Sequence, residues 1–207
     1  NNGSSRDEGI QDDKRVISSE VTIKPISQIV PGITKEAVGY IKQGESTLNS
    51  IKTNDNISPQ SAVKWLVTLY NDGVKDMVDY KVEDAVTDPF HLITKDEAKK
   101  LHKGVINQAF TYTIYNANNS QKYTEDITEK VWTLIGNNKV NEFAFDFTDS
   151  KYTIPAGGYA KLELYTENSD QTRYQIYINT ATLVPSQDFN ANGVKSGHGE
   201  LVKNDSG

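Results

Sequence analysis

The stretch Ala62-Val-Lys-Trp-Leu-Val-Thr-Leu-Tyr70 gives the strongest strand signal in the chain, and a hairpin turn follows it directly. Its odd-numbered residues are apolar, which predicts a strand with one face in a core. Asn71-Asp72-Gly73 supplies the positive φ that a tight hairpin needs. The returning strand, Met77 to Val86, places its even-numbered residues, including Asp84, on one face. This hairpin predicts an antiparallel β protein.

The same alternation recurs along the rest of the chain, whereas helical spacing is confined to two short segments. Pro31-Gly32 and the polar stretches Gly44–Pro59 and Asn116–Tyr123 are read as turns and loops. Further strands are predicted over Val21–Ile23, Glu36–Gln43, Val105–Asn116, Phe143–Phe147, Tyr159–Thr166 and Tyr174–Val184. Short helices are predicted over Thr94–Gly104, with Thr94 and Glu97 as a capping box, and over Asp126–Ile135. The pattern predicts an all-β sandwich with one or two short helices in its connections.

Three domain segments are expected. Residues 1–18 are polar and should be disordered, 19–185 should form the sandwich, and 186–207 should be a C-terminal strand, tail or linker. A division at Gly104 into two smaller sandwiches is the alternative, although each half would have a thin core.

The acidic balance, with a net charge of −6 and a pI near 5.1, argues against nucleic acid or an anionic membrane as partner. No apolar run approaches the roughly 18 residues of a membrane span. A cysteine-free acidic β protein fits the extracellular surface proteins of Gram-positive bacteria, while a cytosolic protein that lacks cysteine stays open. The chain begins without Met, so we expect an excised fragment or mature form whose cell-wall anchor lies elsewhere.

Signals for an enzyme, a cofactor or a metal are weak. The three histidines, His91, His102 and His198, lack metal-ligand spacing and are expected on the surface. The stretch Asp188–Asn192 resembles the start of a calcium loop, but its twelfth position is Gly199 rather than an acid. An Asx-rich turn explains the same residues. We therefore expect no metal and no cofactor.

A lysine, an acid and an asparagine on strands could carry a different chemistry. A buried Lys amine can attack the side-chain amide of Asn, expel ammonia and form an intramolecular isopeptide bond. Burial keeps the amine neutral, and a nearby protonated Asp or Glu polarises the amide and moves protons. The reaction needs three inward-pointing polar residues from three strands.

Strand parity selects one residue of each type. Lys42 shares a face with Tyr40, Asp84 with Tyr80 and Val82, and Asn179 with Tyr177 and Ala181. Lys24, Lys64 and Glu83 point the other way. The alternative is that these residues have ordinary structural roles. Lys42 would then be solvated, Asp84 would form a turn, and Asn179 would be a hydrogen-bonded core amide.

Several stretches together resemble the Ig-like domain of Gram-positive collagen-binding adhesins, over roughly residues 33–185. They are Tyr40-Ile-Lys42-Gln-Gly44, Val63-Lys-Trp65 through Asn71, Tyr80 through Asp84, and Ile178-Asn-Thr-Ala181. The resemblance implies an Ig-like sandwich of the DEv-IgG type. It also implies a Lys42–Asn179 cross-link with Asp84 as proton shuttle. The loop Glu45–Pro59 is longer than in the family, and one copy of the domain does not imply collagen binding.

The leading hypothesis is therefore a surface adhesin or pilin-type module without enzymatic activity beyond its own cross-linking. Its expected partners are neighbouring domains of the same protein and a host matrix protein or glycan. The alternative is a lectin-like or matrix-binding domain without a cross-link, with its site on Gly44–Pro59 or Asn116–Tyr123. An enzyme acting on an external substrate is a third interpretation.

Overall fold

The computed structural model describes residues 29–51, 56–57, 60–88, 90–168, 175–185, 194–195 and 199–203. Four sequence predictions lie outside these residues: the disordered segment 1–18, the strand Val21–Ile23, the calcium-like loop Asp188–Asn192 and the surface position of His198.

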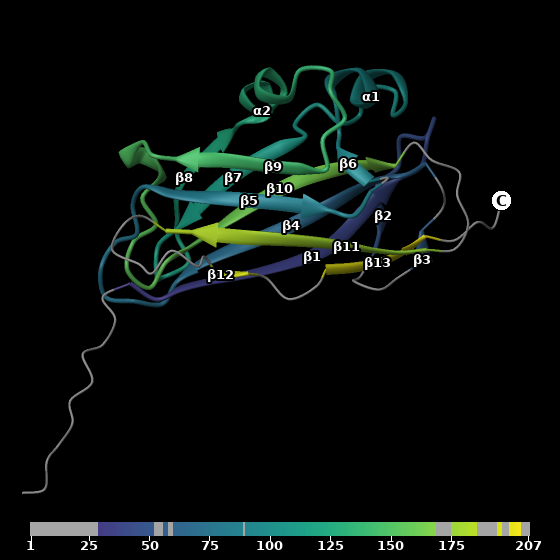
Figure 1. The fold of residues 1–207 in the computed structure, drawn as a ribbon. Helices are drawn as coiled ribbons and strands as arrows, with labels where there is room; N and C mark the ends of the chain where they lie inside the picture. The colour runs from purple at the N-terminus through teal and green to yellow at the C-terminus, as the bar shows by residue number, and fades with distance from the viewer. Residues whose placement is uncertain are drawn as a thin grey trace, which may run out of the picture.

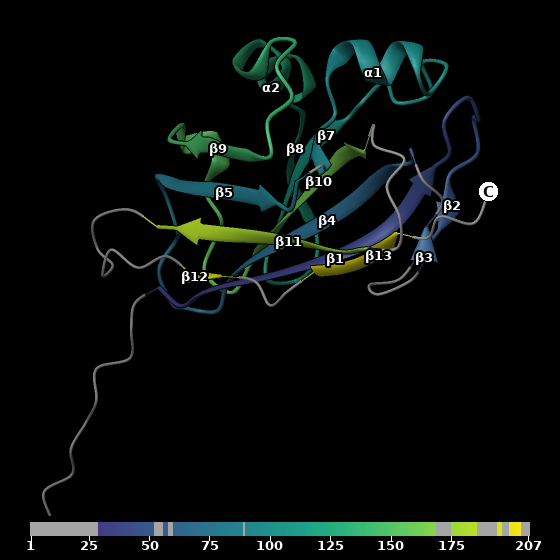
Figure 2. The ribbon, with the colours of Figure 1, turned by 45° about the vertical axis from the view of Figure 1, so that its right-hand side comes forward.

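The described strands form two sheets that face each other (Figures 1 and 2). One sheet contains, in spatial order, β2 (Asn49–Ser50), β1 (Pro31–Ile41), β4 (Ala62–Asn71), β10 (Tyr159–Asn168), β7 (Phe110–Tyr115) and β8 (Gln121–Asp126), with β6 (Phe90–Leu92) also on β10. The other contains β3 (Asn56–Ile57), β13 (Gly199–Lys203), β11 (Gln175–Val184), β5 (Tyr80–Val86) and β9 (Glu142–Phe147), with β12 (Val194–Lys195) on β11. Among these ladders only β3–β13 is parallel. The predicted all-β, Ig-like sandwich is confirmed.

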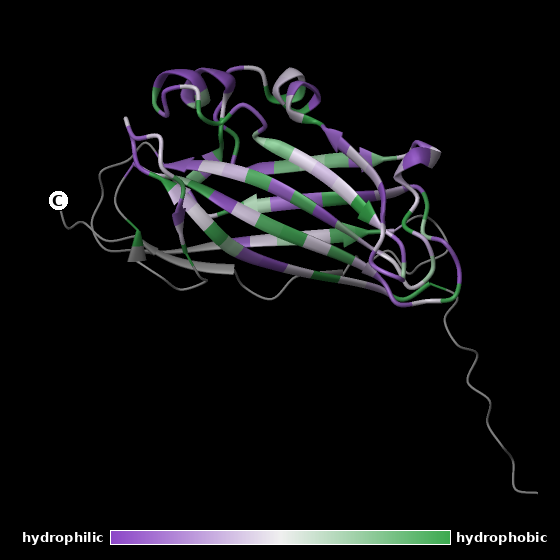
Figure 3. Cartoon of the chain, turned by 180° about the vertical axis from the view of Figure 1, so that it is seen from behind, coloured by the Kyte–Doolittle hydropathy of each residue, from purple (hydrophilic) through white to green (hydrophobic). Residues whose placement is uncertain are grey.

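Hydrophobic and hydrophilic residues alternate along many of the strands, as the green and purple bands in Figure 3 show. The sheets pack because strands such as β1, β5 and β7 bury every second side chain. The largest fully buried side chains are Trp65, Tyr80, Tyr112, Phe90, Phe110 and Phe147. Strand β4 pairs with β10 and β5 pairs with β9, so both sheets combine strands from the two sides of Gly104. The alternative of two sandwiches divided at Gly104 is therefore wrong. The predicted hairpin after Tyr70 is also wrong, because β4 and β5 lie in different sheets and the chain crosses between the layers there.

Strand β1 differs from its prediction in a way that matters for the site. It begins at Pro31, where no ladder N–H is needed, instead of at Glu36 after a turn. Its register against β4 slips between Ala37 and Gly39, so Val38 is an extra residue. Ile33, Lys35 and Ala37 are buried before the slip. The buried positions stay odd-numbered after the slip, because Gly39 and Ile41 are buried whereas Tyr40 is half-buried.

The two short helices, α1 (Lys95–Lys100) and α2 (Thr128–Ile135), lie on one side of the sandwich (Figure 1). The predicted capping box is confirmed, because Glu97 N donates to Thr94 Oγ1 at 3.3 Å and Thr94 N donates to Glu97 Oε2 at 3.0 Å. The loop predicted up to Tyr123 is instead a turn followed by β8. In the part of the chain that the structure describes, no helix is long and apolar enough to cross a membrane.

Replacing Phe147 with Ala should lower the free energy of unfolding by about 3–5 kcal/mol, as for other buried aromatic truncations. The Phe147 ring is fully buried, and its centroid lies 4.3 Å from that of Tyr112 and 5.2 Å from that of Tyr80. Urea denaturation measures the loss. Leu134→Ala is the control, because Leu134 is 65% exposed and should change stability by less than about 0.5 kcal/mol. Equal effects of the two substitutions would contradict the core assignment.

Candidate functional site

A lysine and an aspartate meet in the core between the two sheets. Lys35 lies on β1 with its side chain 0% exposed, and its Nζ donates to Asp84 Oδ2 on β5. Asp84 is also buried, on the inner face of the opposite sheet with Val82 and Val86. The pair therefore bridges the two layers.

Burial changes the proton affinity of this lysine. Desolvation lowers the pKa of Lys35 from 10.5 to about 8, although the charge and hydrogen bond of Asp84 act in the opposite direction. The neutral, nucleophilic form of Lys35 is therefore more accessible near neutral pH than that of an ordinary lysine. An exposed lysine would be almost entirely protonated at the same pH.

Asn179 lies beside this pair on β11. Asn179 is directly opposite Val86 on β5, and Ala181 is directly opposite Asp84, so Asn179 and Asp84 are diagonal neighbours on one face. Strand β1, which carries Lys35, also packs close to β11. Three strands thus place an amine, a carboxyl group and an amide in the same part of the core.

The amide of Asn179 is buried without the partners that such a group normally has. The residue is 0% exposed, and neither Nδ2 nor Oδ1 has a hydrogen-bond partner among the described residues. Asp84 Oδ1 also lacks one within the described part of the chain. Each buried unsatisfied group costs about 1–3 kcal/mol, so this arrangement calls for a functional explanation.

The lysine at this place is Lys35, not the Lys42 selected from the sequence. Lys42 follows the last residue of β1 and is only half-buried. It lies seven residues beyond Lys35, or about 23 Å along the strand, which is farther than a lysine side chain extends. The sequence pattern predicted the face of Val38, Tyr40 and Lys42 as the inner one. The buried residues of β1 are instead the odd-numbered ones, which include Lys35. Asp84 and Asn179 do lie on the inner face, as predicted.

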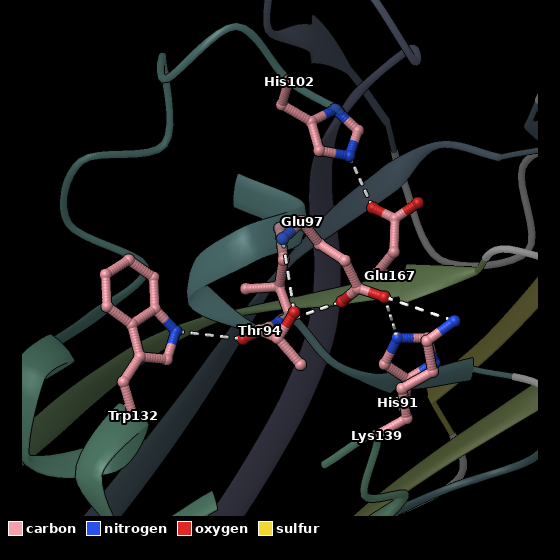
Figure 4. Close-up of polar contacts among 8 residues, drawn as sticks. His91, Thr94, Glu97, His102, Trp132, Lys139 and Glu167 are labelled. Carbon is pink, nitrogen blue, oxygen red and sulfur yellow. Dashed lines mark hydrogen bonds and ion pairs between the residues drawn. The ribbon is translucent and has the colours of Figure 1, made fainter. Parts of the chain in front are cut away.

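The expected surface position of two histidines is also wrong. His91 is 4% exposed and His102 is 0% exposed, and both contact buried glutamates (Figure 4). His91 Nε2 lies 2.7 Å from Glu97 Oε1, and His102 Nε2 lies 2.5 Å from Glu167 Oε2. Glu167 is also directly opposite His91 in the β10–β6 ladder. These four side chains form one buried network.

This His–Glu network ties α1 and the turn after it to the end of β10. Burial raises the pKa of Glu97, but hydrogen bonds from His91 and Thr94 outweigh it and leave the pKa below its usual value. Burial raises the pKa of Glu167, and the hydrogen bond with His102 offsets this only in part. In the described ranges no group of three or more His, Asp or Glu is placed to hold a metal ion. The sequence signal for the network was the capping box, which fixes Glu97 at the start of α1.

The loop Asn116–Tyr123, predicted as a possible recognition site, uses its polar side chains within its own turn. Asn116 Nδ2 donates to Ser120 Oγ at 3.0 Å, and Ser120 N donates to Asn118 Oδ1 at 3.0 Å. The other predicted loop, Gly44–Pro59, lies partly outside the described residues.

No protein-family model and no curated protein sequence matches this chain. Among solved structures, the chain is similar to ACE19, the collagen-binding subdomain of the Enterococcus faecalis surface protein ACE. The two share 13% sequence identity with a TM-score of 0.40, and the match covers 86% of this chain and 96% of ACE19. The chain is also similar to the C-terminal domain of the Streptococcus agalactiae AgI/II polypeptide BspA, with 11% identity, a TM-score of 0.49 and coverage of 84% and 50%. The Streptococcus pneumoniae pilus backbone RrgB has 12% identity, a TM-score of 0.48 and coverage of 79% and 33%. This chain thus spans about half of the BspA structure and a third of the RrgB structure. At such identities and TM-scores the likenesses do not establish its function.

Replacing Glu167 with Gln should change how stability depends on pH. Because burial raises the pKa of Glu167 above its ordinary value of 4.5, the contribution of this residue to stability is fully present below pH 4.5 and is lost as the pH rises through the folded-state pKa. The loss is about 1.4 kcal/mol for each unit by which the pKa is raised. Wild type should therefore lose more stability than Glu167→Gln between pH 4.5 and neutrality, as thermal unfolding at a series of pH values measures. Parallel profiles for the two proteins would argue against a strained, ionisable Glu167.

Proposed function

We propose that this chain is an extracellular module of a Gram-positive surface adhesin or pilin, stapled by an autocatalytic isopeptide bond between Lys35 and Asn179. Asp84 is the proton shuttle of that reaction. The observation that carries the proposal is the buried Lys35–Asp84 pair beside an Asn179 amide that has no hydrogen-bond partner among the described residues. A stable sandwich does not need such an arrangement, whereas amide transfer does.

The reaction exchanges one amide for another. Lys35 Nζ in its neutral form attacks Cγ of Asn179, while the proton on Asp84 polarises Oδ1 of the amide. Asp84 then carries a proton from the attacking nitrogen to Nδ2, and the Cγ–Nδ2 bond breaks. The products are an Nζ–Cγ amide and one ammonia, so no oxidant or co-reactant is required.

The proton balance explains why the acid must contact the lysine. The reactive state needs a neutral amine and a protonated carboxyl group at the same time. Transfer of one proton from Lys35 to Asp84 produces both at once, without exchange with solvent. Above about pH 8, the pKa of Lys35, the lysine has lost this proton to solvent and has none to transfer within the pair.

The bond would give the module mechanical and thermodynamic strength. Positions 35 and 179 are 144 residues apart, and closing a loop of this size stabilises a fold by about 5 kcal/mol on the loop-entropy model for disulfides. It would join β1 in one sheet to β11 in the other. Force along the chain would then pass through a covalent bond and bypass the sheet hydrogen bonds.

This role agrees with the cysteine-free composition, because the cross-link takes the place that disulfides occupy in other secreted domains. The partners we propose are neighbouring domains of the same cell-wall-anchored protein, and a host matrix protein or glycan for the assembled adhesin.

The intact mass of the protein tests the bond directly. Wild type should weigh about 17 Da less than its sequence because one ammonia is lost per Lys–Asn amide formed. Lys35→Ala, Asp84→Ala and Asn179→Ala should each have the full sequence mass. Lys42→Ala is the matched control and should keep the deficit. A full mass in wild type, or a deficit abolished by Lys42→Ala alone, would overturn the assignment.

Single-molecule pulling tests the mechanical role. Wild type should release only the residues outside positions 35–179, because the intervening segment is closed by the bond. Asp84→Ala should release an additional length of roughly 50 nm, from 144 residues at about 3.5 Å each. Equal contour lengths for the two proteins would mean that the segment is not closed.

A further inference from the structure

The indole ring of Trp65 lies against the reactive amine. Lys35 Nζ is 5.4 Å from the centroid of the Trp65 ring, within the range of a cation–π contact. Trp65 is on β4, directly opposite Ala37 of β1, and is therefore a diagonal neighbour of Lys35 on the inner face. The ring forms a wall of the site on the lysine's own sheet.

A buried hydrogen bond fixes this wall from the side of β10. The indole Nε1 of Trp65 donates to Thr166 Oγ1 at 2.9 Å, and both residues are 0% exposed. Thr166 is opposite Val63 in the β10–β4 ladder, one diagonal step from Trp65. Rotation of the indole would break this bond and leave a buried donor unsatisfied, at a cost of about 1–3 kcal/mol.

The Lys35 side chain needs a contact that restricts its orientation, because its reaction partners belong to the other sheet. Asp84 and Asn179 are held on β5 and β11, whereas the Lys35 amine must cross the layer on a side chain with several rotatable bonds. Asp84 holds the amine through one contact, at Oδ2, and a single contact does not by itself fix the orientation of a flexible side chain. Reaction rates fall steeply when attacking atoms are misplaced, by up to about a hundredfold for 1 Å.

We propose that Trp65 is a positioning residue for the Lys35–Asn179 reaction, and that Thr166 acts through the indole by locking the orientation of the ring. This inference rests on the proposed isopeptide function. It assigns the two residues an effect on the rate of bond formation, beyond their part in the core.

The experiment follows bond formation in newly made chains. The full chain is synthesised in a short cell-free pulse, translation is stopped, and samples are quenched in denaturant over time. Mass spectrometry then gives the fraction that has lost about 17 Da, the mass of the leaving ammonia. Thr166→Val should form the bond about tenfold or more slowly than wild type, and Thr166→Ser should restore the rate because it keeps the hydroxyl.

Thr128→Val is the matched control for a purely structural effect. Thr128 is also a buried threonine whose hydroxyl bonds to main chain, at 3.0 Å from Phe110 N, but it lies on α2 and not at the site. It should lower stability similarly while the folded protein forms the bond at the wild-type rate. All variants are compared at a temperature where each is folded by circular dichroism.

The pH profile gives a second readout that stability alone would not move. In wild type the rate should fall above about pH 8, the pKa of Lys35. Trp65→Leu removes the π face that stabilises the ammonium form, so this alkaline limb should move down by about one pH unit.

The outcomes separate the two proposals. If wild type never loses ammonia, the isopeptide function fails and this inference fails with it. If wild type cross-links but Thr166→Val reacts as fast as Thr128→Val, only the positioning role is overturned. The positioning role is supported if Thr166→Val forms the bond slowly and Thr166→Ser forms it at the wild-type rate. The alkaline limb of the pH–rate profile should also move to lower pH in Trp65→Leu.

Discussion

The contact between Lys35 and Asp84 across the sandwich is the constraint on which the rest of the site depends. Removing two charged groups from water is costly, and their mutual attraction repays this only when they meet in good geometry. The contact therefore fixes which face of β1 and β5 points inward and how the sheets are aligned. A neutral amide between Lys35 and Asn179 would remove the lysine's charge from the core, so the proposed reaction would also relieve this desolvation cost.

Much of the site could be predicted from the sequence, and the failure at the lysine has a local cause. Asp84 and Asn179 lie on strands whose mutual ladder is regular from 179 to 184, so period-two parity placed them correctly. In β1 the register slips after Ala37, and the strand begins five residues earlier than predicted. The buried positions of β1 nevertheless stay odd-numbered from Ile33 to Ile41, so the error lies in the choice of the inner face. Parity predicts which residues share a face, but a face with Val38 and Tyr40 looked more apolar than one that holds Lys35 and Gly39.

The buried histidines show a different limit of sequence reading. Histidine spacing is a signal for metal sites, but His91 and His102 each pair with a glutamate instead. One pair is close in sequence and adjoins a visible capping box. The other joins residues 65 positions apart, brought together only because β10 returns beside β6. Such pairing is a property of topology, and no local pattern encodes it.

Of the three asparagines buried on described strands, Asn71, Asn168 and Asn179, the first and the last make the strongest internal comparison. Asn71 and Asn179 are both 0% exposed and both lie on sheet strands. Asn71 Nδ2 donates to Lys75 O at 2.8 Å and to Ile154 O at 3.2 Å, and its Oδ1 accepts from Gly73 N at 3.3 Å. The fold can therefore satisfy both ends of a buried amide, as it does at Asn71. It leaves the Asn179 amide with no partner among the described residues, next to a lysine whose pKa burial lowers to about 8. A structural amide would follow the pattern of Asn71, whereas an electrophile must have its carbonyl carbon and leaving nitrogen free to change bonding.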